Sequence, residues 1–382
     1  MSHILILGGD GYLGWPTAMY FSNLGYEVTI VDNYFRRNAC KDLNLSMLYP
    51  VPDLDKRAQI WSEKTGYTIR VIIGDLGDPD FTRSLFDPSC NSKEWAQPET
   101  VVHYAEQPSA PYSIMNYKYA DITLINNLRV TNNLLWAIRD YAPNIHLIKL
   151  GTMGEYGTPN IDIEEGWIDI DHKGRSDRFL FPRQASSLYH TTKIMDTDLL
   201  WFGVRLWNLR VTDLMQGPVY GIETEESKID NRLMTIFNYD EIFGTIINRF
   251  VVQSTIGHPL TIYGKGEQTR GFINIKDTMQ CIYHSEKTPA KKGELRIFNQ
   301  ITETFSVNQL ANLISAVGND RGHNVEIKQV KNPRIELEEH YYNPVYQGLT
   351  DIGLTPNYLT SDVIHKFFLI VEKYKNLSLI HI

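Results

Sequence analysis

The chain has 382 residues, of which 42% are hydrophobic and 21% are charged. This composition is typical of a globular protein with a buried core, and it excludes a disordered or coiled-coil chain. The 37 lysines and arginines against 45 aspartates and glutamates give a net charge of −8, so we expect no broad surface for nucleic acid. The length predicts two or three domains.

The three cysteines, Cys40, Cys90 and Cys281, are widely spaced and form no C-x-x-C pair. We therefore expect reduced thiols in a cytoplasmic protein, and no metal site. No stretch approaches the roughly 18 to 20 consecutive apolar residues of a membrane span, so no membrane partner is expected. Residues 4–7 run directly into glycines, which predicts a core strand at the start of the chain and no cleavable leader.

Up to about Asp213, short β-rich runs alternate with longer helical patterns. The predicted strands are residues 3–7, 27–31, 68–73, 100–103, 146–150 and 208–212. The predicted helices, with apolar residues three and four apart, are residues 14–24, 116–141 and 184–202. This alternation predicts an α/β fold with a doubly wound, Rossmann-type parallel sheet.

After Asp213 the pattern becomes irregular, with glycine and proline punctuation such as Gly217-Pro218. We expect an NAD-binding Rossmann domain in residues 1–213 and a smaller, discontinuous α/β lobe for the UDP-sugar in residues 214–382. Segments near 240–257 and 272–288 are expected to return to the Rossmann domain. Two connections, 36–67 and 158–183, are longer than the sheet requires, and we expect both to cover ligand.

Three glycines, Gly8, Gly11 and Gly14, follow the first predicted strand and open the first predicted helix. In this context they permit a tight turn, a close approach to a pyrophosphate and packing of the helix on the sheet. Asp32 closes the second strand, about 20 residues after the glycines, where a carboxylate can accept both ribose hydroxyls. The pattern favours NAD over NADP.

Further cofactor contacts are expected beside these residues. Asp75 follows the third strand and is a candidate partner of the adenine; the alternative is an aspartate that only forms the turn. Arg36 and Arg37 weaken the preference for NAD slightly, because an arginine can accommodate a 2′-phosphate, but Asp32 would repel that phosphate directly. The other expected cofactor contacts are Tyr12, Leu13, Asn33, Leu76 and Tyr104.

Tyr189 and Lys193 are four residues apart in a predicted helix, so their side chains project from one face. This helix follows the fifth strand, which leads into Thr152 at the edge where open α/β sheets bind ligands. We expect Lys193 to lower the pKa of Tyr189, which then acts as a general base on a sugar hydroxyl. Thr152 would hold the same oxygen, Lys193 would also contact the cofactor, and NAD would supply the redox chemistry.

These motifs resemble the extended short-chain dehydrogenase/reductase superfamily that acts on nucleotide sugars. Further stretches resemble, more narrowly, the family of UDP-sulfoquinovose synthases, and they extend over essentially the whole chain. They are residues 8–12, 152–166, 184–190, 257–261, 264–271, 298–300 and 332–343.

The resemblance implies that sulfite, free or from a donor protein, is joined to UDP-glucose to give UDP-sulfoquinovose and water. The implied route oxidises carbon-4, removes the carbon-6 hydroxyl as water, adds sulfite to the resulting alkene and reduces carbon-4 again. Carbon–sulfur bond formation is formally the reverse of a hydrolysis. Arg270 and Arg334 match nucleotide-binding positions of the family, Gln216 is a further candidate, and Thr152 and Tyr189 would hold the sugar. A homodimer is expected from the superfamily.

Two departures from related patterns concern proton transfer and sulfite. Related 4,6-dehydratases carry Asp and Glu directly after the threonine, whereas this chain has Met153 and Gly154. His190 is therefore our candidate for proton transfer near carbon-6, with a helix histidine that faces a neighbouring loop as the alternative. Glu155 is a second candidate, or else it bonds backbone in its own loop. Family members typically carry an arginine where this chain has Pro108.

Three alternatives remain open at this stage. A UDP-glucose 4-epimerase would use the same Thr152, Tyr189 and Lys193 with NAD but would rotate the keto-sugar. A 4,6-dehydratase is disfavoured by Met153 and Gly154. A non-catalytic NAD-binding scaffold is disfavoured because such proteins usually lose the tyrosine or the lysine, and both are present here.

Overall fold

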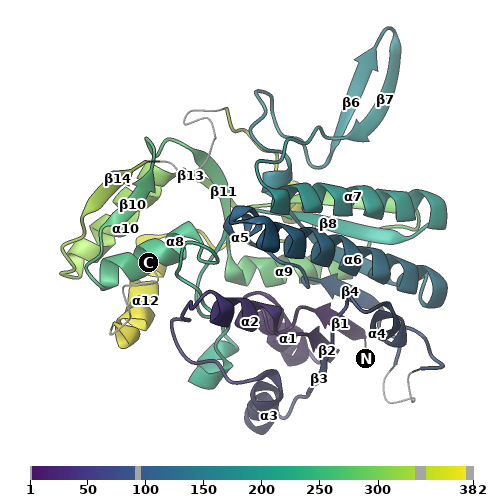
Figure 1. Ribbon diagram of the computed structural model, residues 1–382, viewed down its shortest axis with the longest axis horizontal. Helices are drawn as coiled ribbons and strands as arrows, with labels where there is room; N and C mark the ends of the chain where they lie inside the picture. Colours follow the sequence, from purple (N-terminus) through teal and green to yellow (C-terminus); the bar gives the residue numbers. More distant parts are fainter. Residues whose placement is uncertain (1, 91–95, 332–340, 376–382) are drawn as a thin grey trace.

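The computed structural model describes residues 2–90, 96–331 and 341–375 (Figure 1). A seven-stranded parallel sheet forms its centre, with the strand order β12-β8-β5-β4-β1-β2-β3. Its strands are β1 (His3–Leu7), β2 (Glu27–Asp32), β3 (Ile69–Ile73), β4 (Thr100–His103), β5 (His146–Thr152), β8 (Arg210–Gln216) and β12 (Glu294–Gln300). The predicted doubly wound sheet is confirmed.

The chain builds this sheet outward from β1 in two directions. It adds β2 and β3 on one side, then returns to place β4, β5 and β8 on the other. Because all of these pairs are parallel, the carboxyl ends of the strands share one edge of the sheet. The strand order reverses between β1 and β4, which is the position where such sheets bind ligands.

Helices cover both faces of the sheet (Figure 1). One hydrophobic cluster joins the sheet to α6 (Tyr117–Tyr141) and α7 (Leu188–Trp207), with α4 (Pro79–Ser84) beside α6. A second cluster joins the other face to α1 (Gly14–Asn23), α3 (Leu54–Thr65) and α9 (Ile275–Lys287). Among the described residues, no helix has the length and apolar character needed to cross a bilayer.

A third hydrophobic cluster defines a smaller part of the molecule. Its helices are α8 (Ile246–Thr255), α10 (Val307–Asp320) and α12 (Ser361–Val371), which pack on one another. It contains two small sheets. One pairs β10 (Leu260–Tyr263) with β14 (Ile327–Val330), and the other has the order β13 (Glu303–Ser306), β11 (Thr269–Asn274) and β9 (Val219–Tyr220).

The remaining short elements, from both parts of the molecule, are α5 (Ala110–Ile114), α11 (Gly348–Asp351), η1 (Met153–Glu155), η2 (Ser227–Ile229), η3 (Asn231–Leu233) and η4 (Glu372–Tyr374).

The later segments differ from the sequence-based expectation in one respect. Residues 240–257 were expected to return to the Rossmann domain. They contain α8, whose Ile247, Phe250 and Val251 are buried in the hydrophobic cluster of the smaller part. Residues 272–288 contain α9, which contacts α1 and β5. The seventh strand, β12, pairs with β8 and was not predicted.

The two long connections both contain regular secondary structure. The first contains α2 (Phe35–Asp42) and α3, and Arg36 of α2 lines the cavity described below. The second contains an antiparallel hairpin of β6 (Trp167–His172) and β7 (Arg175–Leu180), which projects away from the body of the molecule in Figure 1. Its tip is solvent-exposed, so the hairpin does not cover the cavity described below.

Candidate active site

A cavity of about 730 Å³ lies at the carboxyl edge of the sheet, between the sheet and the smaller part. It collects the ends of β1, β2, β3, β4, β5 and β8. The predicted cofactor contacts that line it are Gly8, Gly11, Tyr12, Leu13, Gly14, Asp32, Asn33, Arg36, Asp75, Leu76 and Tyr104. Thr152, Tyr189, His190, Gln216 and Arg270 line the same cavity.

The glycine turn is tight for a geometric reason. Gly8 has a φ of +89°, and a Cβ at this position would lie 2.9 Å from the backbone nitrogen of Ala105. A Cβ at Gly14 would lie only 2.0 Å from the carbonyl oxygen of Gly8. The first turn of α1 therefore stays close to β1, and the backbone between them is open to a ligand. These features fit the pyrophosphate of NAD.

Asp32 ends β2 at the cavity wall. Its carboxylate accepts the backbone N–H groups of Asp10, at 2.8 Å, and Tyr34, at 2.6 Å. Burial, with a further contribution from Asp10, raises the pKa of Asp32 to about 6. A carboxylate held in this way fits the ribose hydroxyls of NAD, because it keeps lone pairs available for two hydroxyl donors.

Sequence analysis missed the ion pairs that brace this turn. Asp10 is buried between the glycines and accepts hydrogen bonds from Nε and Nη2 of Arg37, at 2.7 and 2.8 Å. It also accepts a bond from Arg57 of α3, whose side chain is fully buried. The signal in the sequence was Asp10 itself, because a charged residue inside a tight glycine motif is buried and needs partners of opposite charge. The pairs tie α2 and α3 to the cofactor turn.

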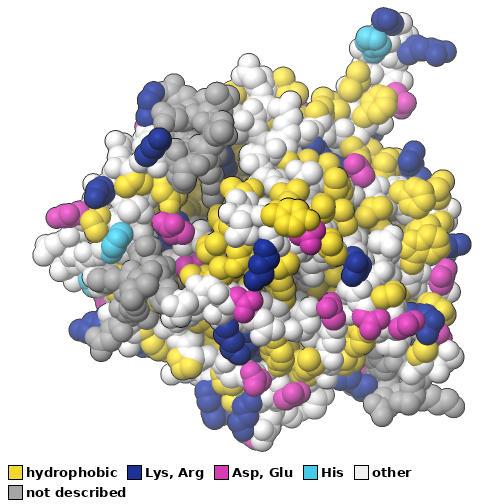
Figure 2. All heavy atoms as spheres, in the orientation of Figure 1, with side chains coloured by type: hydrophobic (Ala, Val, Ile, Leu, Met, Phe, Trp, Pro, Cys, Tyr) yellow, Lys and Arg dark blue, Asp and Glu magenta, His cyan; other side chains and the backbone are white. Residues whose placement is uncertain are grey.

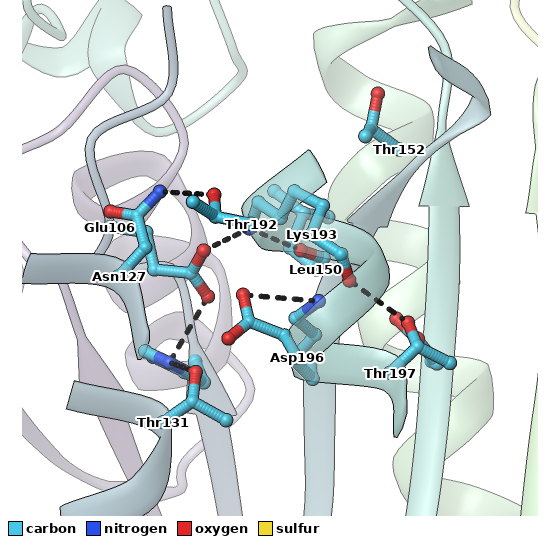
Figure 3. Close-up of polar contacts among 12 residues, drawn as sticks. Glu106, Asn127, Thr131, Leu150, Thr152, Thr192, Lys193, Asp196 and Thr197 are labelled. Carbon is cyan, nitrogen blue, oxygen red and sulfur yellow. Dashed lines mark hydrogen bonds and ion pairs between the residues drawn. The ribbon is translucent and has the colours of Figure 1, made fainter. Parts of the chain in front are cut away.

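Tyr189 and Thr152 both line the cavity, whereas Lys193 lies behind its wall. Lys193 Nζ is 5.9 Å from the centre of the Tyr189 ring, 2.7 Å from Glu106 Oε2 and 2.7 Å from the carbonyl oxygen of Leu150 (Figure 3). Burial, and then Glu106, raises the pKa of Tyr189 above its ordinary value. This differs from the lowered pKa that we expected, because the spacing of Tyr189 and Lys193 reveals neither the burial of the tyrosine nor the nearby Glu106.

His190 lies in the cavity wall beside Tyr189, with their ring centres 5.1 Å apart. Its Nδ1 is 3.1 Å from the hydroxyl oxygen of Ser187, the N-cap of α7. A Cβ at Gly154 would lie 2.3 Å from His190 Nε2, so the imidazole occupies space that only a glycine leaves open. The departure at Gly154 and the candidate His190 are therefore linked in space.

Glu155 is placed differently from our catalytic prediction. It is fully buried behind the cavity wall, and its Oε1 accepts the backbone N–H of Thr152 at 3.2 Å. The two residues form a reciprocal capping box around η1. Burial raises the pKa of Glu155 to about 7, with Lys149 acting in the opposite direction. The structure gives Glu155 a capping role, which was the alternative we had left open.

The expected nucleotide-sugar residues lie at the side of the cavity nearest the smaller part. Gln216 Nε2 donates to Gln300 Oε1 at 2.9 Å, and Arg270 Nη1 donates to the carbonyl oxygen of Thr269 at 2.9 Å. Arg334 lies outside the described residues. Sequence analysis missed Phe243, which lines the cavity 4.2 Å from the guanidinium carbon of Arg36. A lone aromatic residue in an irregular stretch carries no periodic signal.

The class of protein follows from the fold, the glycine turn and a match to a family model. Residues 4–299 match the NAD dependent epimerase/dehydratase family, so the chain belongs to this family and NAD is its cofactor. The chloroplastic UDP-sulfoquinovose synthase of Spinacia oleracea is 46% identical over 98% of this chain and 76% of its own length. The UDP-sulfoquinovose synthase of Sulfolobus acidocaldarius is 41% identical over 92% of this chain and 88% of its own length. Within the larger family, the chain is a member of the UDP-sulfoquinovose synthases.

Solved structures support the fold. A UDP-glucose 4-epimerase of Thermotoga maritima, solved with UDP-glucose, has a TM-score of 0.71 at 18% identity, over 97% of this chain and 99% of its own. A UDP-glucuronic acid 4-epimerase of Bacillus cereus, solved with UDP-glucuronic acid and NAD, has a TM-score of 0.70 at 19% identity over the same shares. The doubly wound sheet and its smaller companion are therefore a fold that this chain shares with both epimerases.

Proposed function

We propose that this protein joins sulfite to UDP-glucose and releases UDP-sulfoquinovose and water. The names of the spinach and Sulfolobus relatives supply the product. The substrates, UDP-glucose and sulfite, are those that the resemblance to this family implies. The observation that carries the proposal is that a single cavity is lined by the glycine turn with Asp32 and also by Tyr189 and His190. A cofactor and a sugar can thus meet beside the residues that move protons.

Tyr189 and Thr152 serve the carbon-4 hydroxyl in this proposal. Tyr189 takes the hydroxyl proton as general base, and Thr152 holds the same oxygen by a hydrogen bond. Bound NAD supplies the oxidation of carbon-4 and, at the end of the cycle, its reduction. Lys193, held behind Tyr189, offsets negative charge that develops on the tyrosine oxygen.

His190 serves the elimination of water. A ketone at carbon-4 acidifies the hydrogen at carbon-5, and the carbon-6 hydroxyl must gain a proton to leave as water. His190 lies in the cavity wall where Gly154 leaves space, and an imidazole can donate and accept protons near neutral pH. Sulfite then adds to carbon-6 of the alkene, and carbon-5 regains a proton.

The test is to incubate the purified protein with UDP-glucose, with and without sulfite, and to identify the nucleotide sugar by mass spectrometry. We expect a sulfite-dependent product that is heavier than UDP-glucose by one sulfur dioxide. A sugar of unchanged mass but altered carbon-4 configuration would identify an epimerase instead. The absence of a sulfite-dependent product, both with free sulfite and in the presence of a cell extract that can supply a donor protein, would count against the synthase.

Several finer assignments belong to the same proposal. Residues 1–213 with α9 and β12 bind the cofactor, while the smaller part holds UDP through Arg270 and Arg334, with Gln216 beside the sugar. Sulfite arrives free or from a donor protein, and Pro108 lines the cavity where the family carries arginine. The protein acts as a homodimer. A cytoplasmic location is supported by the three free cysteines, although the spinach relative is chloroplastic.

A further inference from the structure

A row of ionisable side chains crosses the sheet directly below the cavity. His103 of β4 pairs in register with Lys149 of β5, and Lys149 pairs with Asp213 of β8. Neighbouring residues in register point to the same face of a sheet, and all three side chains are fully buried. Lys149 and Asp213 can carry opposite charges, and charged side chains are rarely fully buried in a protein core.

Glu106 and α7 complete this buried cluster (Figure 3). Glu106 Oε2 lies 2.7 Å from Lys193 Nζ, and Glu106 Oε1 lies 3.2 Å from His103 Nε2. One turn further along α7, Asp196 Oδ2 lies 3.7 Å from Lys149 Nζ. Glu106 therefore connects the row in the sheet to the lysine behind the catalytic tyrosine. In Figure 3, Thr152 stands apart from this cluster.

The loop that carries Glu106 is fixed from two helices. Asn127 of α6 accepts the backbone N–H of Gln107 at 2.8 Å and donates to the carbonyl oxygen of Gln107 at 3.2 Å. The same amide donates to the hydroxyl of Thr192 at 3.1 Å, next to Lys193 on α7. The position of the Glu106 carboxylate relative to Lys193 is thus set by α6, α7 and the end of β4 together.

The charges in this cluster compensate one another. Burial acts to raise the pKa of Glu106, but the positive charges of Lys193 and Lys149 lower this pKa to about 2. Glu106 is therefore a carboxylate at neutral pH. Burial raises the pKa of Asp196 well above its ordinary value, with Glu106 acting in the same direction. A cluster of this kind costs free energy unless its members remain paired, and such clusters concentrate at functional sites.

We propose that Glu106 is a positioning residue of this active site: it holds Lys193 behind Tyr189 and sets the pH at which Tyr189 loses its proton. Its negative charge opposes the loss of that proton, both directly and by neutralising Lys193. The other groups that face Tyr189 or Glu106 are Arg36, His103, Lys149, Glu155, His190 and Asp196. The inference rests on the proposed function only for the role of Tyr189 as the base.

The test measures the titration of Tyr189 directly, so it does not depend on which sugar is converted. The tyrosinate ultraviolet band is recorded against pH for the NAD-loaded protein, and the signal of a matched Tyr189→Phe protein is subtracted. We expect Glu106→Gln to shift this titration by about one pH unit or more toward acid, since a nearby charge typically shifts a pKa by about one to three units. Glu106→Asp, which keeps the charge, should restore most of the parental titration.

Glu99→Gln is the matched control, because Glu99 is an exposed glutamate at the other end of β4. It should leave the titration unchanged. Formation of reduced NAD in a single turnover with UDP-glucose, without sulfite, should show the same acid shift for Glu106→Gln. Neither readout requires the addition of sulfite. A failure of the proposed synthase activity can therefore be distinguished from a failure of the inference about Glu106.

An unmoved titration in folded Glu106→Gln would overturn the inference, as would an equal shift in Glu99→Gln. If Glu106→Gln does not fold, Asn127→Ala releases the same loop without removing a charge. We then expect a smaller shift in the same direction, and an unmoved titration would again overturn the proposal.

Discussion

Tyr189 is buried in the cavity wall. Burial disfavours the negatively charged tyrosinate that forms when Tyr189 loses its proton. Replacing it by phenylalanine keeps the ring and removes the hydroxyl. We expect Tyr189→Phe to lower turnover by about 10²- to 10⁴-fold, the usual contribution of one general base. Binding of UDP-glucose, followed by calorimetry, should stay within about threefold because the ring still fills its place. Near-normal turnover would remove Tyr189 from its role.

Asp32 predicts a pH dependence of cofactor affinity. Its pKa in the free protein is raised to about 6, mainly by burial. Ribose hydroxyls donate hydrogen bonds to the ionised carboxylate, so NAD favours the charged form and must displace a proton below the pKa. The affinity for NAD should therefore be constant above about pH 7 and fall as the pH drops through 6, approaching tenfold per unit.

Calorimetric titrations at pH 5, 6 and 7 check this dependence, and buffers of different ionisation enthalpy would reveal the proton released on binding. Asp32→Asn, which does not titrate, should bind NAD more weakly at neutral pH and lose the dependence. An affinity for NAD that stays flat between pH 5 and 7 in the parental protein would contradict the assignment of Asp32 to the ribose.

At the scale of elements, α3 braces the cofactor turn through Arg57. This side chain is fully buried, contacts Asp10 and lies 4.6 Å from the centre of the Trp15 ring. Arg57→Met keeps an apolar stem but leaves Asp10 with one arginine fewer. Breaking a buried pair in this way costs about 3 to 5 kcal/mol of unfolding free energy. Chemical denaturation measures the loss, and Lys56→Met, on the exposed side of the same helix, should change little.

The hairpin of β6 and β7 gives a prediction of the opposite kind. Sequence length alone suggested that residues 158–183 cover ligand, but of this connection Thr158 lies at the cavity while the hairpin projects from the body (Figure 1). Replacing residues 169–178 by a short glycine turn should leave turnover and the affinity for NAD within about twofold, since no cavity contact is lost. A large fall in turnover would show that the hairpin reaches the active site during catalysis.

How far the elements could be predicted depends on how local their signals are. The strands β1 and β4 were predicted to the residue, since apolar runs between turn signals are local features. The strand β12 was missed because Arg296 interrupts its apolar run and its partner β8 lies far away in the sequence. The helix α8 is amphipathic, but a pattern of apolar residues does not tell which core they join.

The same distinction applies to the site. Tyr189 and Lys193 share one helix face, and the glycine turn with Asp32 is a compact motif, so spacing was enough to find them. The contact between Glu106 and Lys193 joins residues that are 87 positions apart, and their pairing exists only after β4 and α7 have packed. The raised pKa of Tyr189 follows first from its burial and then from Glu106, and neither is visible in the spacing of Tyr189 and Lys193. Sequence reasoning could not predict which ionisable side chains meet through tertiary packing.

At the scale of the whole molecule, the outer side of α6 and α7 carries an apolar cluster. Trp136, Phe202 and Leu206 are 45%, 40% and 64% exposed, and Trp207 lies between them with its ring centre 5.0 Å from Trp136 and 5.2 Å from Phe202. Figure 2 shows apolar side chains gathered over these helices. Contiguous exposed apolar side chains of this kind are typical of protein interfaces.

We expect the proposed homodimer to pack through this cluster, so that a single charge should separate its subunits. Two-fold symmetry brings the same surface of both subunits together, so Leu206→Arg places two unpaired charges in one apolar contact. Light scattering after gel filtration should give twice the chain mass of 44.0 kDa for the parental protein and a mass near one chain for the variant. The matched control is Leu24→Arg, at a leucine that is 48% exposed beyond the end of α1. It should remain dimeric, because its surroundings belong to the other face of the sheet. A parental protein that is monomeric at micromolar concentration, or a dimer that survives Leu206→Arg, would place the subunit contact elsewhere.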